Sequence, residues 1–192
     1  MTRTLLALGA ALALSGCFGG AKVPDTLMTL NSAQVRPAAT PRSAAEGQAI
    51  TVAVPTVPRE LQTLRVPVHE SELAVSYLKN AQWVEMPATL FARLVSETIG
   101  ATTGRVVLDP KQFSFDPGQR LTGTLQRFGY DAASGQAVAV YDAALGRTGG
   151  GVTTQRFEAR VPAASADAAG VGAALNQAAN QIAADVAQWV GR

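Results

Sequence analysis

The amino-acid sequence predicts an α+β fold: a mostly antiparallel sheet with two helices packed on it, in a single domain. Three observations lead to this prediction. Segments of alternating apolar and polar residues, separated by turn residues, occupy positions 119–161. Apolar stripes at helical spacing run through 87–99 and again through 171–189. A chain of 192 residues is long enough for one domain with a sizeable core.

The first sixteen residues have the layout of a secretory signal peptide. A short basic opening that contains Arg3 precedes the apolar run TLLALGAALAL, and two small residues follow it. An apolar run of this length is too short to span a hydrocarbon core of roughly 30 Å. The sequence therefore predicts a signal peptide over 1–16 and no permanent membrane helix there.

Cys17, the only cysteine of the chain, follows this signal directly. Leu14-Ser15-Gly16-Cys17 resembles a bacterial lipobox, in which cleavage precedes the cysteine and the thiol receives a diacylglycerol. The alternative is that Cys17 is an ordinary small apolar residue. Stable anchoring takes at least two acyl chains, and a mature bacterial lipoprotein typically carries three. Phe18 stands where an aspartate would signal inner-membrane retention, which favours the periplasmic face of the outer membrane.

The charges and ligand-type residues exclude several classes of protein. Removing 1–16 leaves 176 residues with 15 basic and 14 acidic side chains, and the Lys and Arg residues are scattered singly. A nucleic-acid partner is not expected, because such domains carry clustered basic residues. His69 is the only histidine, so a structural zinc site of four Cys or His ligands is excluded. No cofactor is expected apart from the covalent lipid on Cys17.

The first half of the mature chain predicts a tether and then short strands. Residues 17–25 are interpreted as a flexible tether, and the domain is expected to occupy 26–192. Short strands are expected at 26–30 and at 49–54, where Ile50, Val52 and Val54 alternate with smaller residues, with a loop at 32–48 between them. Pro55 and Pro58 are expected to end the second strand.

The next segment predicts a loop, a strand and a helix. Residues 59–72 are expected to form a long loop, and LAVSYL at 73–78 a strand. Pro87 is typical of the first turn of a helix, which is expected to end at Gly100 or Gly104. Its apolar stripe consists of Leu90, Phe91, Leu94, Val95 and Ile99. A short strand is expected at 105–108.

The second half predicts a three-stranded meander followed by a helix. Strands are expected at 119–130, 136–145 and 152–161, with turns at 133–135 and 147–151 and a bulge near Arg127, where the apolar alternation shifts by one residue. In the third strand the inward residues are Phe157, Ala159 and Val161, and the outward ones Arg156, Glu158 and Arg160. After a cap at Ser165 or Asp167, the terminal helix carries Val171, Leu175, Ala178, Ile182, Val186 and Trp189 on one stripe. This stripe is interpreted as core, with a partner helix as the alternative.

No catalytic constellation is present in the sequence. His69 would be the sole base of a serine hydrolase, and no serine lies in a nucleophile-elbow pattern. It is interpreted as a solvated loop residue. The glycine-rich stretch 146–151 lacks the lysine of a phosphate loop and lies between two strands, so it is interpreted as a hairpin turn. The sequence therefore predicts a protein that is not an enzyme.

The order of these features is similar to that of a known family. The matches are the lipobox, Val52, Val54 and Pro55, then Leu61, Val75, Tyr77, Trp83 and Pro87, and the helix over 88–99. The sequence resembles the ABC-type transport auxiliary lipoproteins, which include the lipoprotein of the paraquat-inducible Pqi system. The resemblance covers nearly the whole mature chain. It implies a periplasmic α+β domain whose mixed sheet carries two helices, tethered to the outer membrane.

The resemblance also implies a function and partners. Members of this family accompany an ABC transporter and a periplasmic MCE-domain protein that move lipids between the two membranes. The expected role is therefore that of a non-catalytic docking component. The candidate partner-binding residues are Leu61, His69, Glu70, Tyr77 and Trp83. Two alternatives are a lipid-binding module that holds an acyl chain and an assembly lipoprotein that braces an outer-membrane β-barrel; homo-oligomerisation is left open.

Overall fold

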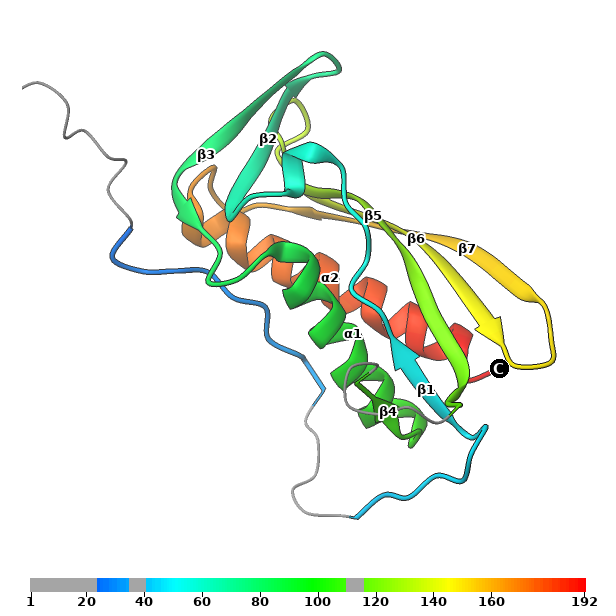
Figure 1. Cartoon of the computed structure of the whole chain (residues 1–192). Helices are drawn as coiled ribbons and strands as arrows, with labels where there is room; N and C mark the ends of the chain where they lie inside the picture. Colours follow the sequence, from blue (N-terminus) through cyan, green and yellow to red (C-terminus); the bar gives the residue numbers. More distant parts are fainter. Residues whose placement is uncertain (1–23, 35–40, 110–115) are drawn as a thin grey trace, which may run out of the picture.

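The computed structural model describes residues 24–34, 41–109 and 116–192 (Figure 1). The signal peptide, Cys17 and most of the expected tether lie outside the described residues. The elements in chain order are β1 (Ala49–Val52), the short 3-10 helix η1 (Arg59–Leu61), β2 (Arg65–Ser71), β3 (Ala74–Gln82), α1 (Pro87–Thr103), β4 (Val107–Leu108), β5 (Gly118–Asp131), β6 (Gln136–Arg147), β7 (Val152–Pro162) and α2 (Ala168–Val190). The predicted α+β class is confirmed.

The sheet is mixed and is organised around β5. Along one edge β5 pairs with β6, which pairs with β7, and both pairings are antiparallel. The other edge of β5 is shared by two strands that run parallel to it: β1 pairs with its first residues and β2 with its last. Strand β4 extends the sheet beyond β1 in parallel, and β3 extends it beyond β2 in antiparallel. The segment between β1 and β2 therefore runs alongside β5, and a bridge joins Thr56 of this segment to Thr124 of β5.

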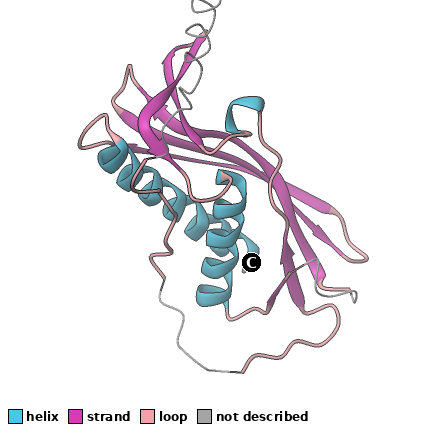
Figure 2. Cartoon of the chain, turned by 60° about the vertical axis from the view of Figure 1, so that its left-hand side comes forward, coloured by secondary structure: helices cyan, strands magenta, loops and turns pink. Residues whose placement is uncertain are grey.

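Both helices cover the same face of the sheet (Figure 2). Helix α2 packs on β6 and β7, and α1 lies beside α2 and contacts β1 and β4. The predicted α1 stripe is confirmed, because all five of its residues are buried. At the centre of the core, Phe91 lies edge-on to Tyr141 with ring centroids 5.1 Å apart, and Trp83 stacks on Phe128 at 5.5 Å. These rings join α1 to the sheet.

The ends of the helices follow the signals in the sequence. Pro87 occupies the first turn of α1, where its missing N–H leaves no bond unmade, and Gly104 ends the helix at a left-handed φ of 71°. Asp167 is the N-cap of α2 and accepts a 2.9 Å hydrogen bond from the Gly170 N–H. This bond holds the pKa of Asp167 below its usual value. At the other end, Trp189 is half-buried, with its ring edge-on to Phe157 at 5.7 Å.

The meander agrees with the sequence in detail. The register between β5 and β6 shifts between Leu125 and Arg127, which confirms the predicted bulge. In β7 the residues predicted to face inward are buried and those predicted to face outward are exposed. Burial alternates strictly from Arg156 to Pro162, and such alternation fixes which face of a strand points to the core.

Three predictions for the first half of the domain are corrected. The expected strand at 26–30 is a single bridge between Met28 and Trp83. Strand β1 ends at Val52, the last of its residues to pair with β5, and Val54 is 54% exposed. The expected loop 59–72 contains η1 and the whole of β2.

A proline explains why the sequence did not predict β2. A proline within an apolar run argues against a strand, because it cannot donate to the ladder. Pro67 lies where the pairing of β2 with β3 shifts register, between Arg65 and Pro67. Such a bulge is one of the places at which a strand tolerates proline.

Replacing Gly129 with alanine is expected to lower the free energy of unfolding by about 1–3 kcal/mol, the usual cost of overpacking. A Cβ at Gly129 would lie 2.5 Å from the Pro67 carbonyl oxygen, so β2 would have to move away from β5. Urea unfolding measures the change. Gly151→Ala is the control, because a Cβ there meets nothing within 4 Å. Equal stability of the two variants would contradict the close approach of β2 to β5.

Candidate partner-binding surface

The β2–β3 hairpin projects from the body of the domain. Strand β2 pairs with β5 only through Val68 and His69, so the hairpin continues beyond the last strand that could cover it. We call residues 70–75 the arm. Figure 1 shows the arm rising away from both helices, at the opposite end of the sheet from the β6–β7 turn. Its position leaves both faces of the arm open to solvent.

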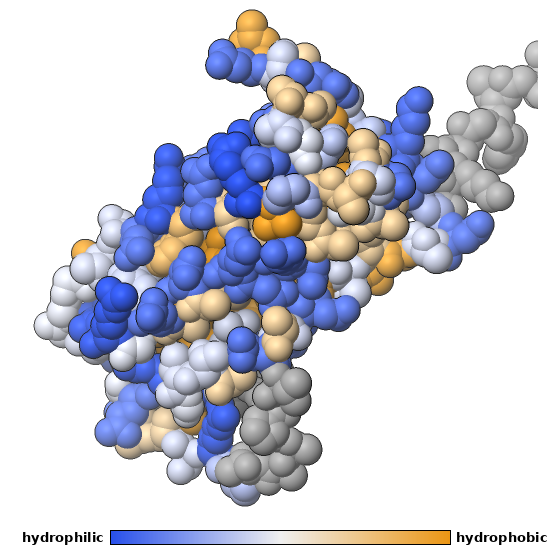
Figure 3. Space-filling model, turned by 180° about the vertical axis from the view of Figure 1, so that it is seen from behind, coloured by the Kyte–Doolittle hydropathy of each residue, from blue (hydrophilic) through white to orange (hydrophobic). Residues whose placement is uncertain are grey.

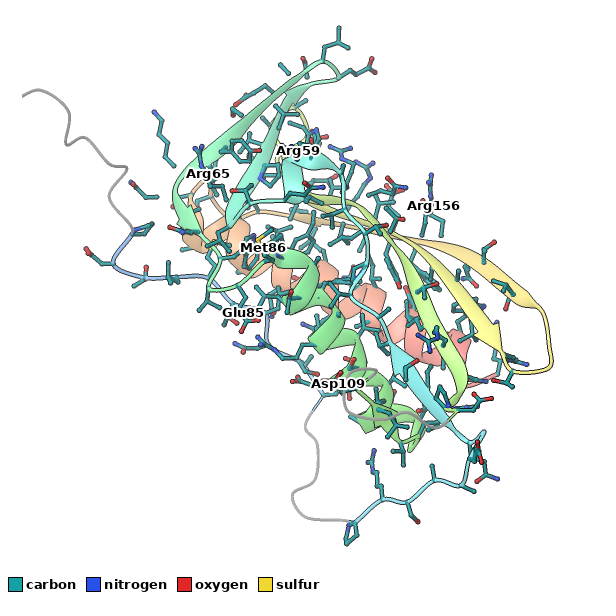
Figure 4. The ribbon with its side chains drawn as sticks, viewed as in Figure 1. Arg59, Arg65, Glu85, Met86, Asp109 and Arg156 are labelled. Carbon is teal, nitrogen blue, oxygen red and sulfur yellow. The ribbon has the colours of Figure 1, made fainter. Side chains whose placement is uncertain are left out.

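A polar cluster at the base of the arm joins it to η1. The Nε2 atom of His69 lies 3.2 Å from Oε1 of Glu60, and the Tyr77 hydroxyl donates a 3.3 Å hydrogen bond to the Glu60 carbonyl oxygen. The Arg65 guanidinium lies 4.4 Å from the centre of the Tyr77 ring, a cation–π contact. Figure 4 labels Arg65 at this base. The structure thus brings two of the candidate residues, His69 and Tyr77, to one place.

His69 differs from the interpretation as a solvated loop residue. It is part of β2, it pairs with Val75 of β3 and Asp131 of β5, and its side chain is 19% exposed. The contact with Glu60 occupies one side of the ring. The histidine therefore fixes the base of the arm against η1 instead of moving freely in water.

The tip of the arm is apolar and is bordered by carboxylates. Leu73 is 99% exposed and Val75 43% exposed. Glu70 and Glu72 are also exposed, and Glu70 accepts a 2.8 Å hydrogen bond from the Ser76 hydroxyl. Figure 3 shows an apolar group projecting at this end of the molecule beside hydrophilic atoms, and a broader apolar area on the body below it.

Leu61 and Trp83 are not at the surface. Leu61 has 0% and Trp83 1% of its surface exposed, and both belong to the main core. Leu61 ends η1, and Trp83 follows β3 directly. Their side chains are enclosed by this domain, so the surface described here does not include these two candidate residues.

The face of the meander away from the helices carries charged residues in pairs. The Arg156 guanidinium donates two hydrogen bonds to the Asp142 carboxylate, of 2.6 and 2.8 Å, and Arg160 donates one of 2.6 Å to Glu158. The bonds from Arg156 hold the pKa of Asp142 below its usual value. Figure 4 shows Arg156 pointing away from the helices. Exposed pairs of this kind contribute little to stability.

An open groove of about 650 Å³ lies between α1, the end of β1 and β4. Val52, Ala92 and Leu108 form part of its apolar lining, and Glu97 and Asp109 add carboxylates. The lining also includes Arg93, whose guanidinium lies 3.2 Å from the Glu85 carboxylate. Figure 4 labels Glu85 near the start of α1 and Asp109 just beyond β4.

The described parts of the chain contain no group of three or more His, Cys, Asp or Glu residues that could hold a metal ion. Among the described helices, neither is long and apolar enough to cross a membrane.

The fold and this surface define a single α+β domain with a projecting hairpin arm. The family model of the ABC-type transport auxiliary lipoprotein component matches residues 29–187, and the chain belongs to that family. The resemblance seen in the sequence is therefore confirmed. The protein is a lipoprotein of the cell envelope and an auxiliary component of ABC-type transport, a class with no known cofactor.

Solved structures share the fold. The DUF330 protein XCC0632 from Xanthomonas campestris superposes with a TM-score of 0.72 at 20% identity, over 86% of this chain and 94% of that one. A crystal structure of an uncharacterized protein gives a TM-score of 0.67 at 15% identity, over 86% of this chain and 99% of that one. A comparison with curated protein sequences found no match.

Proposed function

We propose that this protein is the non-catalytic, outer-membrane-anchored accessory component of an ABC/MCE-type system that moves lipids between the two bacterial membranes. The lipid on Cys17 holds it at the periplasmic face, and the domain binds a periplasmic MCE-domain protein. The family supports the transport role, and the lipobox with Phe18 supports the anchor and the address. The tether over 17–25 would let the domain stand up to about 30 Å from the membrane, since an extended residue spans at most about 3.3–3.6 Å.

The observation that carries the docking role is the arm. A docking component needs a surface that reaches past its own fold, and residues 70–75 extend beyond the last strand of the sheet. His69 and Tyr77 fix the base of the arm, while Glu70 lies on the arm itself. The partner-binding surface proposed here therefore consists of the arm and its polar base.

Reversing the charge of Glu70 is expected to weaken binding to the periplasmic domain of the MCE protein from the same cell by about tenfold. Glu70→Lys places a cation on the arm, whereas Glu158→Lys changes the regular solvent face of β7, where single changes usually matter little. Isothermal calorimetry with the purified pair measures both dissociation constants. Equal weakening by both variants would show that overall charge, and not the arm, controls the interaction.

A second candidate function is favoured by the groove between α1 and β4. Its volume of about 650 Å³ and its apolar lining suit an acyl chain. In that case the domain itself would hold a lipid. Native mass spectrometry of the protein released from the membrane separates the two candidates: a co-purified phospholipid that Ala92→Trp displaces supports the groove.

A further inference from the structure

We infer that Leu73 is the apolar anchor of the arm and that it enters a socket on a partner protein whose rim carries Lys and Arg residues. The identification of this partner as the MCE-domain protein rests on the proposed function. The surface itself is argued from the exposure of Leu73, from the way in which the arm is held, and from the charges around the tip.

The exposure of Leu73 is extreme for this molecule. It is 99% exposed, while the other exposed large apolar residues in the described parts of the chain lie between 37% and 69%. A single exposed leucine on a protein surface is ordinary. Leu73, however, occupies the end of a projecting hairpin, and Val75 of the same arm is also exposed. An apolar anchor that enters a pocket is the usual centre of a protein interface.

The arm is held in shape although no third strand supports it. The Leu73 N–H lies 3.4 Å from the Ser71 hydroxyl oxygen, and the Ser76 hydroxyl donates to Glu70 across the hairpin. At the base, Glu60 contacts both His69 and Tyr77. These contacts restrain the arm before a partner arrives, which lowers the entropy cost of binding.

The charges at the tip decide the kind of partner. From His69 to Ser76 the acidic residues are Glu70 and Glu72, and the segment contains no Lys or Arg. Burying Leu73 in a membrane would bring both carboxylates to the lipid surface, where desolvation and anionic headgroups oppose them. A protein socket with a basic rim buries the apolar tip and pairs both carboxylates with Lys or Arg residues.

The groove between α1 and β4 of a second copy of this chain is a poor match for the arm. This groove is large enough for a leucine, but Glu97 lines it. Its cation, Arg93, already pairs with Glu85. Because the carboxylates of the arm would meet a further carboxylate there, the charges oppose a second copy at this groove. A hollow near the ends of α1 and α2 is lined by Arg105 and Arg192, and the crosslinking experiment below distinguishes a second copy bound there from a different protein.

Binding of the full-length protein, in detergent, to the purified periplasmic domain of the MCE protein tests the anchor. Leu73→Ser is expected to raise the dissociation constant by about 10- to 100-fold, the range for loss of one buried leucine. Val152→Ser is the matched control, since Val152 is 69% exposed at the start of β7, beside the other long hairpin turn. It is expected to change binding less than twofold.

Charge reversal tests the basic rim in the same assay. Glu72→Lys is expected to weaken binding at least tenfold and to reduce the dependence of the affinity on salt, while Asp185→Lys on the exposed side of α2 leaves both unchanged. Circular dichroism confirms that each variant is folded. Wild-type affinity in both Leu73→Ser and Glu72→Lys would overturn the inference.

Photo-crosslinking in living cells separates this inference from the proposed function. A photoreactive phenylalanine replaces Leu73 or, as the control, Val152, and mass spectrometry identifies the product. A crosslink from position 73 to a basic-rimmed pocket of the MCE protein supports both proposals. A crosslink to such a pocket on another envelope protein, abolished by Glu72→Lys, supports the arm and overturns the proposed partner. Crosslinks only to lipid, only to a second copy, or equal from both positions overturn the arm, even where the wild-type protein binds the MCE domain.

Discussion

Replacing Trp83 with alanine is expected to lower the free energy of unfolding by about 3–5 kcal/mol, the usual cost of truncating a buried aromatic residue. Trp83 is 1% exposed, and its ring stacks on the ring of Phe128. The centroid of the Phe128 ring lies 6.4 Å from that of Phe91 in α1. The backbone of Trp83 also forms a bridge with Met28, which precedes the first strand. This bridge holds the segment around Met28 in place. Truncation would therefore open a cavity where three parts of the chain meet.

Urea unfolding of the wild type, Trp83→Ala and Trp83→Phe measures this effect. No described residue accepts a hydrogen bond from the indole N–H of Trp83, so phenylalanine removes a buried unpaired donor and keeps most of the ring contact. Its cost is expected to be well below that of alanine. Trp189→Ala, at a half-buried position near the end of α2, is expected to cost roughly 1–3 kcal/mol. A Trp83→Ala variant as stable as the wild type would contradict the core described here.

Replacing Cys17 with serine is expected to abolish membrane anchoring while leaving the domain folded. The lipobox provides the proposed anchor, and a hydroxyl does not form the thioether to diacylglycerol. The protein is expected in the soluble periplasmic fraction or as an uncleaved precursor. Fractionation with and without detergent checks this result. A serine variant that still needs detergent for extraction would show that something other than Cys17 holds the protein to the membrane.

The address of the anchor is tested separately. Phe18→Asp keeps the lipid but introduces the residue that signals retention in the inner membrane. In a bacterium that follows this rule, sucrose-gradient fractionation is expected to show the variant with the inner membrane. Identical distributions of the variant and the wild type would remove the support for the outer membrane.

Long periodic segments made most of the fold predictable. Helices α1 and α2 carry apolar stripes over many turns, and their ends carry Pro87, Gly104 and Asp167. The meander alternates so regularly that even the bulge before Arg127 is visible as a change of phase. In these segments local pattern and tertiary packing demand the same residues, so the sequence alone is sufficient.

The first half of the domain was less predictable because long-range pairing decides it. Strand β2 contains Pro67, and its pairing with β5 joins residues some sixty positions apart in the chain, such as Val68 and Tyr130. Strand β1 has only four residues and is buried on both faces, so its alternation did not show where it ends. Neither feature leaves a local signal.

Burial divides the candidate residues into two groups, and the sequence does not show which residues are buried. Family similarity selected Leu61 and Trp83, but a residue typical of a family is as often one that packs the core as one that binds a partner. Glu70 and Tyr77 lie on the projecting hairpin, as a contact surface requires. Leu73, the anchor proposed above, was not selected from the sequence, because a leucine at the beginning of an apolar strand is indistinguishable from a core residue until the turn is located.

Co-purification from the native envelope tests the docking role most directly. The full-length lipoprotein is extracted with mild detergent through an affinity tag, and the associated proteins and lipids are identified by mass spectrometry. The proposed function predicts stoichiometric recovery of the MCE-domain protein together with its ABC permease, and loss of both from the Leu73→Ser variant but not from Val152→Ser. Recovery of the wild-type protein alone, or with an outer-membrane β-barrel in place of the MCE protein, would contradict it.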